Sequence, residues 1–551
     1  MRIRDIGLIV VASAAVFAMA NTPATAHDPN TPEGQAAIAE FMADAQGPDR
    51  RAPITGQAAG VACVNGKADK YPCKNVDLMS YLPMSTIGGG NGNDIWGWTD
   101  PTNNKEYALV GRSNGTSFVD VTNASSPVYL GNLPSNGGTS SWRDIDVYAD
   151  HAFIVADFVT GHGMQVFDLT RLRTVTSPQT FTADKIYTGF GPAHTITANP
   201  KTGFVYANGS NTCSGGSHMI DVRTPKNPVN AGCVSQDGYV HDNHCVTYDG
   251  PDTRYTGREI CVNSNEDYLT IVDVTTKSSP VQLSRTTYTG AKYVHQGWFT
   301  KDKRHFLLDD ELDEQNGGTD KRAKTYIWDM SSLTAPRMTG TYNSAVEAID
   351  HQMFVVGDYA YQSNYRAGLR ILDVKNVANN QLSEAAFFDI YETADGVGFN
   401  GTWANYPFFK SGNVIVNGIE QGLFVVRPNL VPEVPPRVFE NSNNVNIPDA
   451  GAAVTSDISV TGVPGNAPTG TKIDVDIKHT WRGDLVIDLI APDGTAYRLK
   501  NSSGNDSADN VIASYTPNLT SESANGVWKL KVQDVARYDT GYIDNFKISF
   551  I

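Results

Sequence analysis

The stretch FVDVTNASSP at 118–127 decides the fold: a β-branched run ends in Asp and is followed by a turn and a proline. The pattern recurs as QVFDLTRLRTVTSP at 165–178, HMIDVRTPKNP at 218–228, TIVDVTTKSSP at 270–280, YIWDMSSLTAP at 326–336 and RILDVKNVANN at 370–380, with a degenerate copy, GLFVVRPN, at 422–429. The marker positions, separated by 48, 53, 52, 56, 44 and 54 residues, are Asp120, Asp168, Asp221, Asp273, Asp329, Asp373 and Arg427. A strand-rich period of about 50 residues is typical of propeller blades.

Each repeat contains more than its marker strand. A second β-branched run precedes every marker, and a third segment that opens with Trp or His precedes that run. With a less patterned strand after the proline, each unit makes a four-stranded blade. We therefore predict an all-β chain whose residues 90–428 form a seven-bladed β-propeller, a closed ring that exposes only short sheet edges. The marker aspartates are predicted to be structural, because a short polar side chain after a strand bonds nearby backbone N–H groups.

The first residues predict export. Arg2 and Arg4 precede an uncharged apolar run, Ile6 to Ala20, and Ala24-Thr25-Ala26 offers small residues to a signal peptidase. This pattern predicts a signal peptide over residues 1–26. The apolar run of about 15 residues is shorter than the roughly 20 that a membrane-spanning helix needs. We expect a secreted, periplasmic or cell-surface protein without a transmembrane segment after cleavage.

Composition and net charge limit the kinds of molecule that this protein is expected to bind. The net charge is −16 and no basic patch is visible, which excludes nucleic acid as a partner. A content of 40% hydrophobic residues with 50 glycines fits a globular β-rich protein with many turns. The expected partner is an unknown protein, glycan or small-molecule ligand at the cell surface.

Six cysteines in an exported chain predict disulfides. Short loops close at the least entropic cost, which favours the pairs Cys63–Cys73, Cys213–Cys233 and Cys245–Cys261. Six cysteines still allow 15 connectivities. The first pair lies in a predicted N-terminal extension, residues 27–89. The third pair would join adjacent antiparallel strands.

The end of the chain has a different pattern. A Pro-rich linker is predicted at 429–438, NLVPEVPPRV. Residues 439–551 lack the repeat and alternate apolar with polar residues, as in KIDVDIKHTWRGDLVIDLIAPDGTAYRLK at 472–500. Such alternation predicts an antiparallel sandwich.

Two resemblances extend these predictions. The stretches HTWRGDLVIDLIAPDGT at 479–495, ANGVWKLKVQD at 524–534 and DTGYIDNFKISF at 539–550 resemble the P domain, or Homo B domain, of proprotein convertases and subtilisin-like proteases. This resemblance covers roughly residues 436–551 and implies a jelly-roll-like sandwich that accompanies serine-type endopeptidase activity and proteolysis. The propeller region resembles the choice-of-anchor B family of bacterial surface proteins, which are built from LVIVD repeats. That resemblance rests on CVNGKADKYPCKNVDLMSYLP at 63–83, GREICVNSNEDYLTIVDV at 257–274 and VHQGWFTKDKRHFLLDDELDE at 294–314.

The chain departs from the protease pattern. A subtilisin-type site needs a spaced set of Asp, His and Ser, and Gly138-Thr139-Ser140 is the one look-alike. It runs into a strand pattern, so we assign no catalytic residue. We predict a binding or scaffold protein. The alternative is a hydrolase, either a serine-type endopeptidase or a metal-dependent propeller enzyme.

One unusual residue opens the innermost strand of every repeat. These residues are Trp96, Trp142, His194, His244, His295, His351 and Trp403. The four histidines fall on consecutive blades and could converge on a divalent transition metal such as Zn²⁺, Cu²⁺, Ni²⁺ or Fe²⁺, because imidazole suits these ions. Asp146, Asp242 and Asp350 could act as ligands or orient the imidazoles. The alternative is that the histidines fill the channel mouth and bond to backbone carbonyls.

An acidic loop is a second candidate site. Its carboxylates are Asp309, Asp310, Glu311, Asp313 and Glu314. Clustered carboxylates repel one another unless a cation or water screens them, and Ca²⁺ prefers such hard oxygen ligands. The alternative is a solvated loop.

Overall fold

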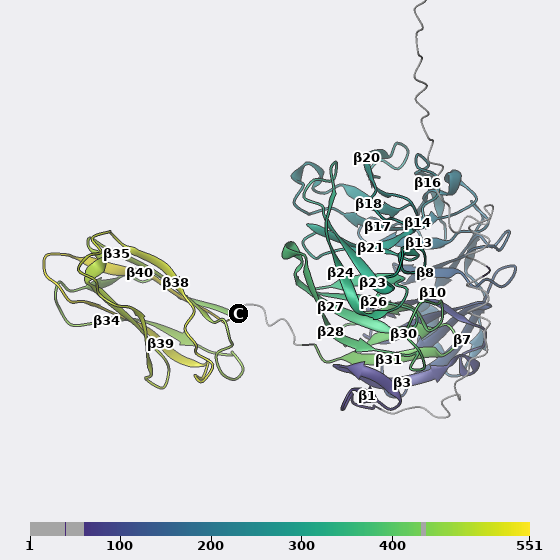
Figure 1. The fold of residues 1–551 in the computed structure, drawn as a ribbon. Helices are drawn as coiled ribbons and strands as arrows, with labels where there is room; N and C mark the ends of the chain where they lie inside the picture. Colours follow the sequence, from purple (N-terminus) through teal and green to yellow (C-terminus); the bar gives the residue numbers. More distant parts are fainter. Residues whose placement is uncertain (1–38, 40–59, 431–436, 551) are drawn as a thin grey trace, which may run out of the picture. The chain divides into compact units, whose positions relative to one another are not determined.

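A computed structural model describes residue 39, residues 60–430 and residues 437–550 (Figure 1). The chain divides into two compact units, Met1–Leu430 and Val431–Ile551. Strands dominate the described residues, which bears out the all-β prediction. The predicted signal peptide at 1–26 and most of the predicted linker lie outside the described residues.

The first unit is a β-propeller. Its described residues contain seven sheets that each have a core of four strands, and two of these sheets carry additional short strands. The first three sheets are β4 (Gly92–Thr99), β5 (Glu106–Arg112), β6 (Gly115–Asp120) and β7 (Val128–Pro134); β8 (Arg143–Tyr148), β9 (His151–Ala156), β10 (Met164–Asp168) and β12 (Lys185–Tyr187); and β13 (Thr195–Asn199), β14 (Phe204–Asn208), β15 (His218–Asp221) and β16 (Val229–Cys233). The short strand β11 (Gln179–Thr180) pairs in parallel with β7.

The remaining sheets follow the same order. They are β17 (Asp242–Thr247), β18 (Glu259–Ser264), β19 (Leu269–Asp273) and β20 (Val281–Thr286); β21 (Val294–Phe299), β22 (His305–Asp310), β23 (Arg322–Asp329) and β24 (Arg337–Glu347); β25 (Gln352–Val356), β26 (Tyr359–Ser363), β27 (Leu369–Asn376) and β28 (Gln381–Phe388); and β29 (Thr402–Tyr406), β30 (Val414–Gly418) and β31 (Gly422–Pro428), completed by β3 (Val76–Pro83). The one α-helix in the described part of this unit beyond residue 60 is α2 (Asp313–Asn316), and short 3-10 turns cover Met84–Thr86, Leu169–Thr174, Cys213–Gly215, Thr253–Tyr255 and Val377–Asn379.

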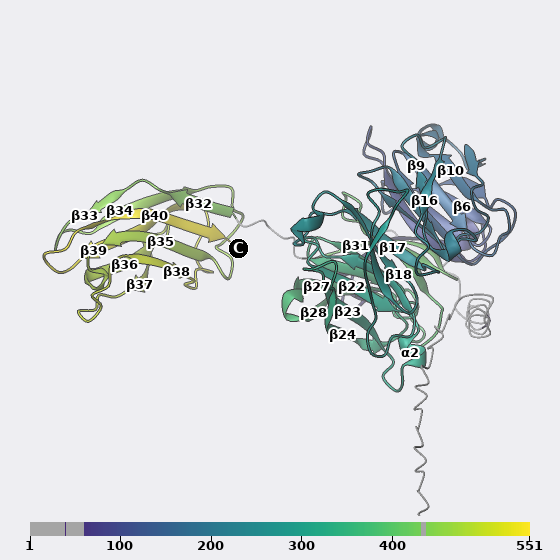
Figure 2. The same ribbon diagram turned by 90° about the horizontal axis from the view of Figure 1, so that it is seen from above.

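The first strand of each sheet lies at the centre of the propeller. These inner strands contact one another in the order β4, β8, β13, β17, β21, β25 and β29, and β29 contacts β4 again. Carboxylates join neighbouring sheets: Asp94 accepts from the N–H of Ile145 at 3.0 Å, and Asp144 accepts from the N–H of Ile196 at 2.6 Å. The inner strands therefore form a closed ring, and their side chains line one channel. Figure 2 shows the sheets of this unit from a second side.

The N-terminal segment belongs to the propeller, in contrast to the predicted start at residue 90. β3 pairs antiparallel with β31 over Val76↔Pro428 to Pro83↔Gly422 and lies beside it in Figure 1. β1 (Lys67–Ala68) and β2 (Tyr71–Lys74) extend the sheet of β28. The repeat pattern missed these strands because they carry no marker Asp. The ring is thus closed by a strand from the start of the chain.

The marker aspartates have the predicted structural role. Each lies at or near the end of the third strand of its sheet, and its Oδ1 accepts a hydrogen bond from the backbone N–H two residues later, at 2.9–3.0 Å. The six aspartates are Asp120, Asp168, Asp221, Asp273, Asp329 and Asp373. They fix the turn that leads to the outer strand.

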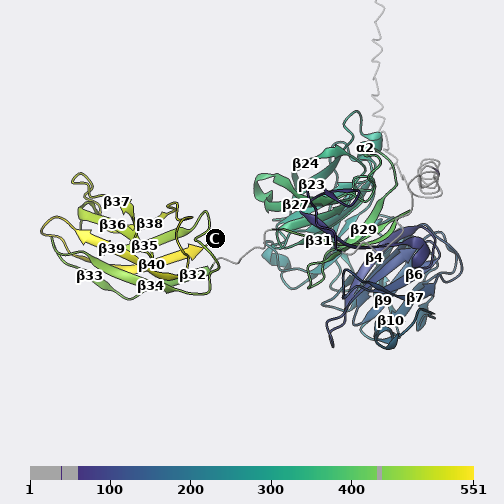
Figure 3. The same ribbon diagram turned by 90° about the horizontal axis from the view of Figure 1, so that it is seen from below.

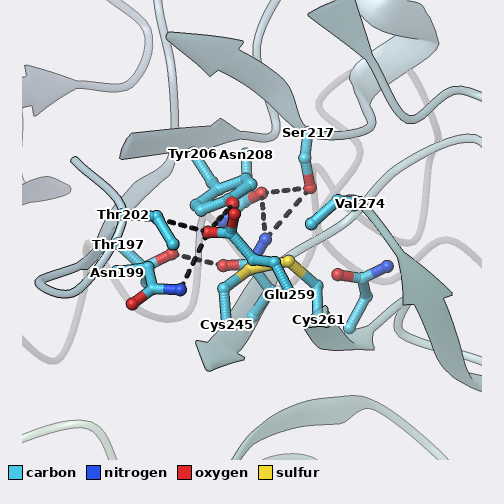
Figure 4. The surroundings of a disulfide bond; sticks show 12 residues. Thr197, Asn199, Thr202, Tyr206, Asn208, Ser217, Cys245, Glu259, Cys261 and Val274 are labelled. Carbon is cyan, nitrogen blue, oxygen red and sulfur yellow. Dashed lines mark hydrogen bonds between the residues drawn. A yellow bond between two sulfur atoms is a disulfide. The ribbon is translucent and has the colours of Figure 1, made fainter. Parts of the chain in front are cut away.

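All three predicted disulfides are present. Cys63 bonds Cys73, Cys213 bonds Cys233, and Cys245 bonds Cys261. The third pair lies directly opposite on β17 and β18, with 4.0 Å between Cα atoms. Figure 4 shows this disulfide beside the buried carboxylate of Glu259, which accepts from Asn199, Thr202 and Tyr206 of the preceding sheet.

The second unit is a β-sandwich (Figure 3). One sheet has the order β32 (Arg437–Asn441), β40 (Gly541–Phe550), β35 (Lys472–His479) and β38 (Val511–Tyr515), with β33 (Val445–Ile447) also on β40. The other has β34 (Val454–Val460), β39 (Gly526–Asp534), β36 (Leu485–Ile490) and β37 (Ala496–Lys500), and a 3-10 turn covers Arg482–Asp484. Alternate residues face inward, as in the burial pattern of β35, and pack around the fully buried Trp528.

Among the described residues, no helix is both long and apolar enough to cross a bilayer.

Candidate metal centre in the propeller channel

Four imidazoles stand side by side at one level of the channel, and we call them the histidine arc. They belong to His194, His241, His295 and His351, at the starts of the third to sixth sheets. Successive ring centroids are 4.3, 4.2 and 4.7 Å apart. Trp403 continues the row at 5.0 Å from His351. The predicted convergence of imidazoles on consecutive blades is therefore present in part.

The structure replaces one predicted member. His244 does not join the arc: it lies further along β17 against Trp298, with 3.6 Å between ring centroids. His241 takes its place. A sequence signal was available, since Tyr239-Val240-His241 matches Tyr293-Val294-His295. Trp96 is likewise displaced to the region of His244, whereas Trp142 and Trp403 border the arc.

Every imidazole of the arc is held through its Nδ1. The acceptors are Asp157 Oδ2 for His194 at 2.9 Å, the carbonyl of His295 for His241 at 3.3 Å, Asp309 Oδ1 for His295 at 3.1 Å and the carbonyl of Trp403 for His351 at 2.6 Å. Donation to these oxygens places the proton on Nδ1 and makes Nε2 the basic nitrogen. Carboxylate or carbonyl partners of this kind orient metal-binding histidines.

One carboxylate joins the arc. Ligand atoms of His295, Glu311 and His351 all lie within 4.8 Å of one another, and all three residues are buried. Glu311 accepts from the Tyr365 hydroxyl at 2.7 Å, and its other oxygen lies 3.7 Å from His295 Nε2. Two imidazole nitrogens and one carboxylate oxygen at this spacing fit a single divalent transition ion. The sequence placed Glu311 in the acidic loop and not with the histidines.

Burial sets the protonation of the site. It lowers the pKa of His351 to about 3, against the smaller opposing effect of the Trp403 carbonyl. The His351 imidazole is therefore neutral at physiological pH, which ligation requires. Burial also raises the pKa of Glu311 to about 7. A cation between these groups would favour the ionised carboxylate.

The acidic loop is buried, so the solvated-loop interpretation is wrong. Its five carboxylates are between 0% and 4% exposed. Each has protein partners: Asp309 accepts from His295, Asp310 from the Tyr288 hydroxyl, Glu311 from Tyr365, Asp313 from Tyr326 and Lys324, and Glu314 from Lys324. Tyrosine hydroxyls and one lysine stabilise these buried carboxylates. The charge pattern of the sequence alone did not reveal these partners. A Ca²⁺ ion at this loop stays a prediction.

The three predicted supporting aspartates lie apart from the ligand atoms. Asp146 and Asp242 line the channel on the side of His244, and Asp242 also reaches the space beside the arc. Asp350 is 2% exposed, and burial, followed by Glu314 and Asp309, raises its pKa well above the usual range. Small cavities of about 20 and 30 Å³ flank the arc. Space for about one water-sized group therefore exists on either side.

The protease look-alike has a local structural role. The hydroxyl of Ser140 donates to the carbonyl of Trp142 at 2.8 Å and accepts from its N–H at 3.0 Å. Ser140 is 6% exposed. These contacts form a turn at the start of the second sheet and do not resemble an activated nucleophile beside a histidine base.

Comparison with known families identifies parts of both units. Residues 469–550 match the family described as the proprotein convertase P-domain, and residues 260–287 and 351–386 match the LVIVD repeat. The chain thus contains LVIVD repeats within a β-propeller and a P-domain at its C-terminal end. The finer resemblance to choice-of-anchor B proteins stays a prediction.

Curated relatives share a limited stretch. Leupeptin-inactivating enzyme 1 of Streptomyces exfoliatus is 58% identical over 120 residues, 22% of this chain and 27% of the relative. Transglutaminase-activating metalloprotease of Streptomyces mobaraensis is 58% identical over 113 residues, 20% of this chain and 15% of the relative. Extracellular basic protease of Dichelobacter nodosus is 31% identical over 114 residues, 21% of this chain and 18% of the relative. The chain thus spans about a quarter or less of the length of these relatives.

Two solved structures with low sequence identity to this chain have a partly similar backbone. The Cps50 (Swd1) β-propeller domain of Myceliophteria thermophila has a TM-score of 0.41 and 10% identity, covering 62% of this chain and 98% of its own. The hydrazine synthase of Kuenenia stuttgartiensis has a TM-score of 0.43 and 11% identity, covering 59% and 93%.

Proposed function

We propose that this protein is an exported binding protein whose propeller holds a divalent transition metal in the histidine arc. The observation that supports this proposal most directly is the group His295, Glu311 and His351, with ligand atoms within 4.8 Å of one another. The oriented Nδ1 atoms add to it, because each imidazole presents Nε2 as the coordinating nitrogen. His241 lies next to His295, with 4.2 Å between ring centroids.

The donor set indicates the class of metal. Imidazole nitrogens with one carboxylate suit Zn²⁺, Fe²⁺, Ni²⁺ or Cu²⁺, whereas Ca²⁺ and Mg²⁺ prefer oxygen ligands throughout. Glu311 would supply the one negative charge of the set. The buried surroundings would favour a tightly held ion with at most one small exogenous ligand, given the flanking cavities of about 20 and 30 Å³.

Metal analysis tests the proposal. We expect protein purified from its native compartment, without a metal-affinity column, to contain about one transition-metal ion per chain, because the ligand set fits a single ion. Replacing His295 and His351 together with alanine should remove that ion. The matched control is His244→Ala, which removes a channel histidine outside the arc and should leave the metal content unchanged.

Two outcomes would reject the metal centre. One is wild-type protein that stays metal-free after incubation with each candidate ion. The other is equal metal content in the double variant and the wild type. Circular dichroism of the double variant separates loss of the site from loss of the fold.

The alternative function is hydrolysis associated with proteolysis. The support for it is that two of the relatives are proteases by name and that a P-domain is present. One relative, the Extracellular basic protease, is extracellular by name, which also supports the proposed secreted, periplasmic or cell-surface location. The partner would be a protein, glycan or small molecule at the cell surface.

A further inference from the structure

The channel holds a third, larger cavity on the side of the arc away from Glu311. Its volume is about 480 Å³. Five aromatic side chains from four inner strands and the segment after β29 form one wall, and we call the cavity the aromatic chamber. They are Trp96, Trp298, Phe354, Tyr406 and Phe408. This volume lies within the range of small-molecule sites.

The aromatic wall is a continuous cluster. Trp96 lies 5.2 Å from Tyr406, Trp298 lies 5.0 Å from Phe354, and Phe354 lies 5.4 Å from Phe408, measured between ring centroids. Trp96, Trp298 and Phe408 are only half-buried. All three side chains line the cavity, so part of each ring is open to a ligand there.

The opposite wall is acidic. Asp144, Asp146 and Asp242, from the second and fourth sheets, line it together with amide side chains. Asp146 and Asp242 are 7% and 8% exposed, and burial is the main cause that raises the pKa of both carboxyls well above the usual range. No arginine lines the chamber among the described residues, and of its two lysines Lys303 is paired with Asp249.

We propose that the aromatic chamber binds an organic cation: a primary or quaternary ammonium group carried on an apolar, ring-sized body. Aromatic faces attract such cations, with about 0.5–2 kcal/mol per contact. Burial disfavours the ionised form of Asp146 and Asp242, and an ammonium group beside them would favour it. An anionic ligand would disfavour ionisation further, and a neutral ligand would leave it unchanged.

The carboxylates retain acceptor capacity for such a ligand. Asp146 accepts from the N–H of Val147 at 2.5 Å and from the N–H of Ala198 at 2.6 Å, one bond to each oxygen. A carboxylate oxygen offers about two lone-pair sites, so each can accept a further donor from the cavity. The backbone bonds fix the carboxylate before the ligand arrives.

The chamber is a site separate from the metal centre. Its lining includes none of His295, Glu311 and His351. Four polar residues line both the chamber and the 30 Å³ cavity beside the arc and so lie between the two: Asp144, Asp242, Gln296 and Gln352. The inference therefore goes beyond the proposed metal function and does not depend on it.

Binding of phenethylammonium to the full-length protein tests the chamber. Tryptophan fluorescence and calorimetry should show saturable binding. Phenethyl alcohol and 3-phenylpropionate, of similar shape, should bind at least tenfold more weakly, in line with the strength of one charged contact. The titrations are run on metal-loaded and on chelator-treated protein, so that failure of the metal proposal and failure of this one are distinguishable.

Variants locate the site. Asp146→Asn and Phe408→Leu should each weaken phenethylammonium binding about tenfold, the loss of one charged or cation–π contact. Asp320→Asn, which removes an exposed carboxylate paired with Arg322, should have no effect. Thermal melting checks that each variant is folded. Absence of saturable binding, equal binding of the alcohol or carboxylate, tighter binding of glucose, or unchanged affinity in both chamber variants would overturn the proposal.

Discussion

Hydrogen bonds at Nδ1 orient the four histidines of the arc, and their acceptors come from different parts of the fold. His194 is held by Asp157, which follows β9, and His295 is held by Asp309 at the end of β22. His241 and His351 use carbonyls of the next sheet. Because each imidazole depends on its own or a neighbouring sheet, the arc can form only when adjacent sheets are in contact.

His162 gives a pH-dependent prediction at this scale. It is fully buried, its Nδ1 donates to the Gly163 carbonyl at 2.8 Å, and its Nε2 lies 3.2 Å from the Arg143 guanidinium. Burial, with a smaller effect of Arg143, lowers its pKa from 6.5 to about 4. Between these values the unfolded state binds more protons, so the free energy of unfolding should fall as pH drops from 6.5 to 4, by on the order of 3 kcal/mol.

Denaturant unfolding at several pH values measures this effect. The control is His162→Asn, which retains a donor for Gly163 but cannot titrate. The variant should lose the part of the pH dependence that lies between 6.5 and 4. Parallel curves for wild type and variant would show that His162 does not contribute.

The sequence correctly predicted three of the four histidines of the arc. The repeat period identifies which segment forms the inner strand but not the residue at which the strand begins. A shift of three, from His241 to His244, moves a side chain along the channel and to the other face of the strand. The sequence alone could not place Glu311 beside the histidines, because Glu311 follows β22 and approaches the arc only when the chain folds.

At the scale of elements, closure of the propeller depends on β3. Leu78 in β3 is fully buried and packs in a cluster with strands of the last two sheets. Leu78→Asp would place a charge in that cluster. We expect it to destabilise the first unit by more than about 3 kcal/mol, since the variant loses apolar burial and buries an unpaired carboxylate.

The matched control is Val128→Asp in β7, another outer strand. Val128 is 55% exposed, so this change should alter stability by about 0.5 kcal/mol or less. The denaturant midpoint of the full chain measures both variants. A Leu78→Asp protein as stable as Val128→Asp would show that β3 does not hold the ring together.

The sequence predicted most strands of the first unit, and the exceptions have physical causes. Six marker aspartates made the third strand of each sheet visible, because the turn that follows requires their side chains. β3 has no such turn and was assigned to an extension. The charge pattern of the sequence suggested that the carboxylates of the acidic loop require solvent. In the structure, tyrosine hydroxyls bond them instead, from the segment between β20 and β21, from β23 and from the segment after β26; Tyr326 and Tyr365 are two of these tyrosines.

For the whole molecule, we expect the isolated chain to lack endopeptidase activity. The P-domain match covers residues 469–550, and the described part of the first unit is occupied by propeller sheets. The Ser140 hydroxyl is bonded to the backbone of Trp142. Incubation with a general protein substrate such as casein should yield no fragments above a buffer control.

A Ser140→Ala variant distinguishes contamination from activity of the chain. Cleavage by wild-type protein that disappears in this variant would establish a serine protease and overturn the binding-protein proposal. Cleavage that persists in the variant points to a co-purified protease. A chelator-sensitive cleavage that also disappears in the His295 and His351 double variant would instead support the metal-dependent hydrolase.

The pairing of β3 with β31 also determines when the first unit can finish folding. The Tyr81 hydroxyl bonds the Gln421 carbonyl, a partner 340 residues later in the chain. A ribosome synthesises β3 first and β31 near the end, so the early strand has no partner during most of translation. Such a high contact order makes closure a slow, late event and leaves an exposed strand edge in the meantime. Nascent chains that stop before residue 422 would therefore be the species most in need of a chaperone.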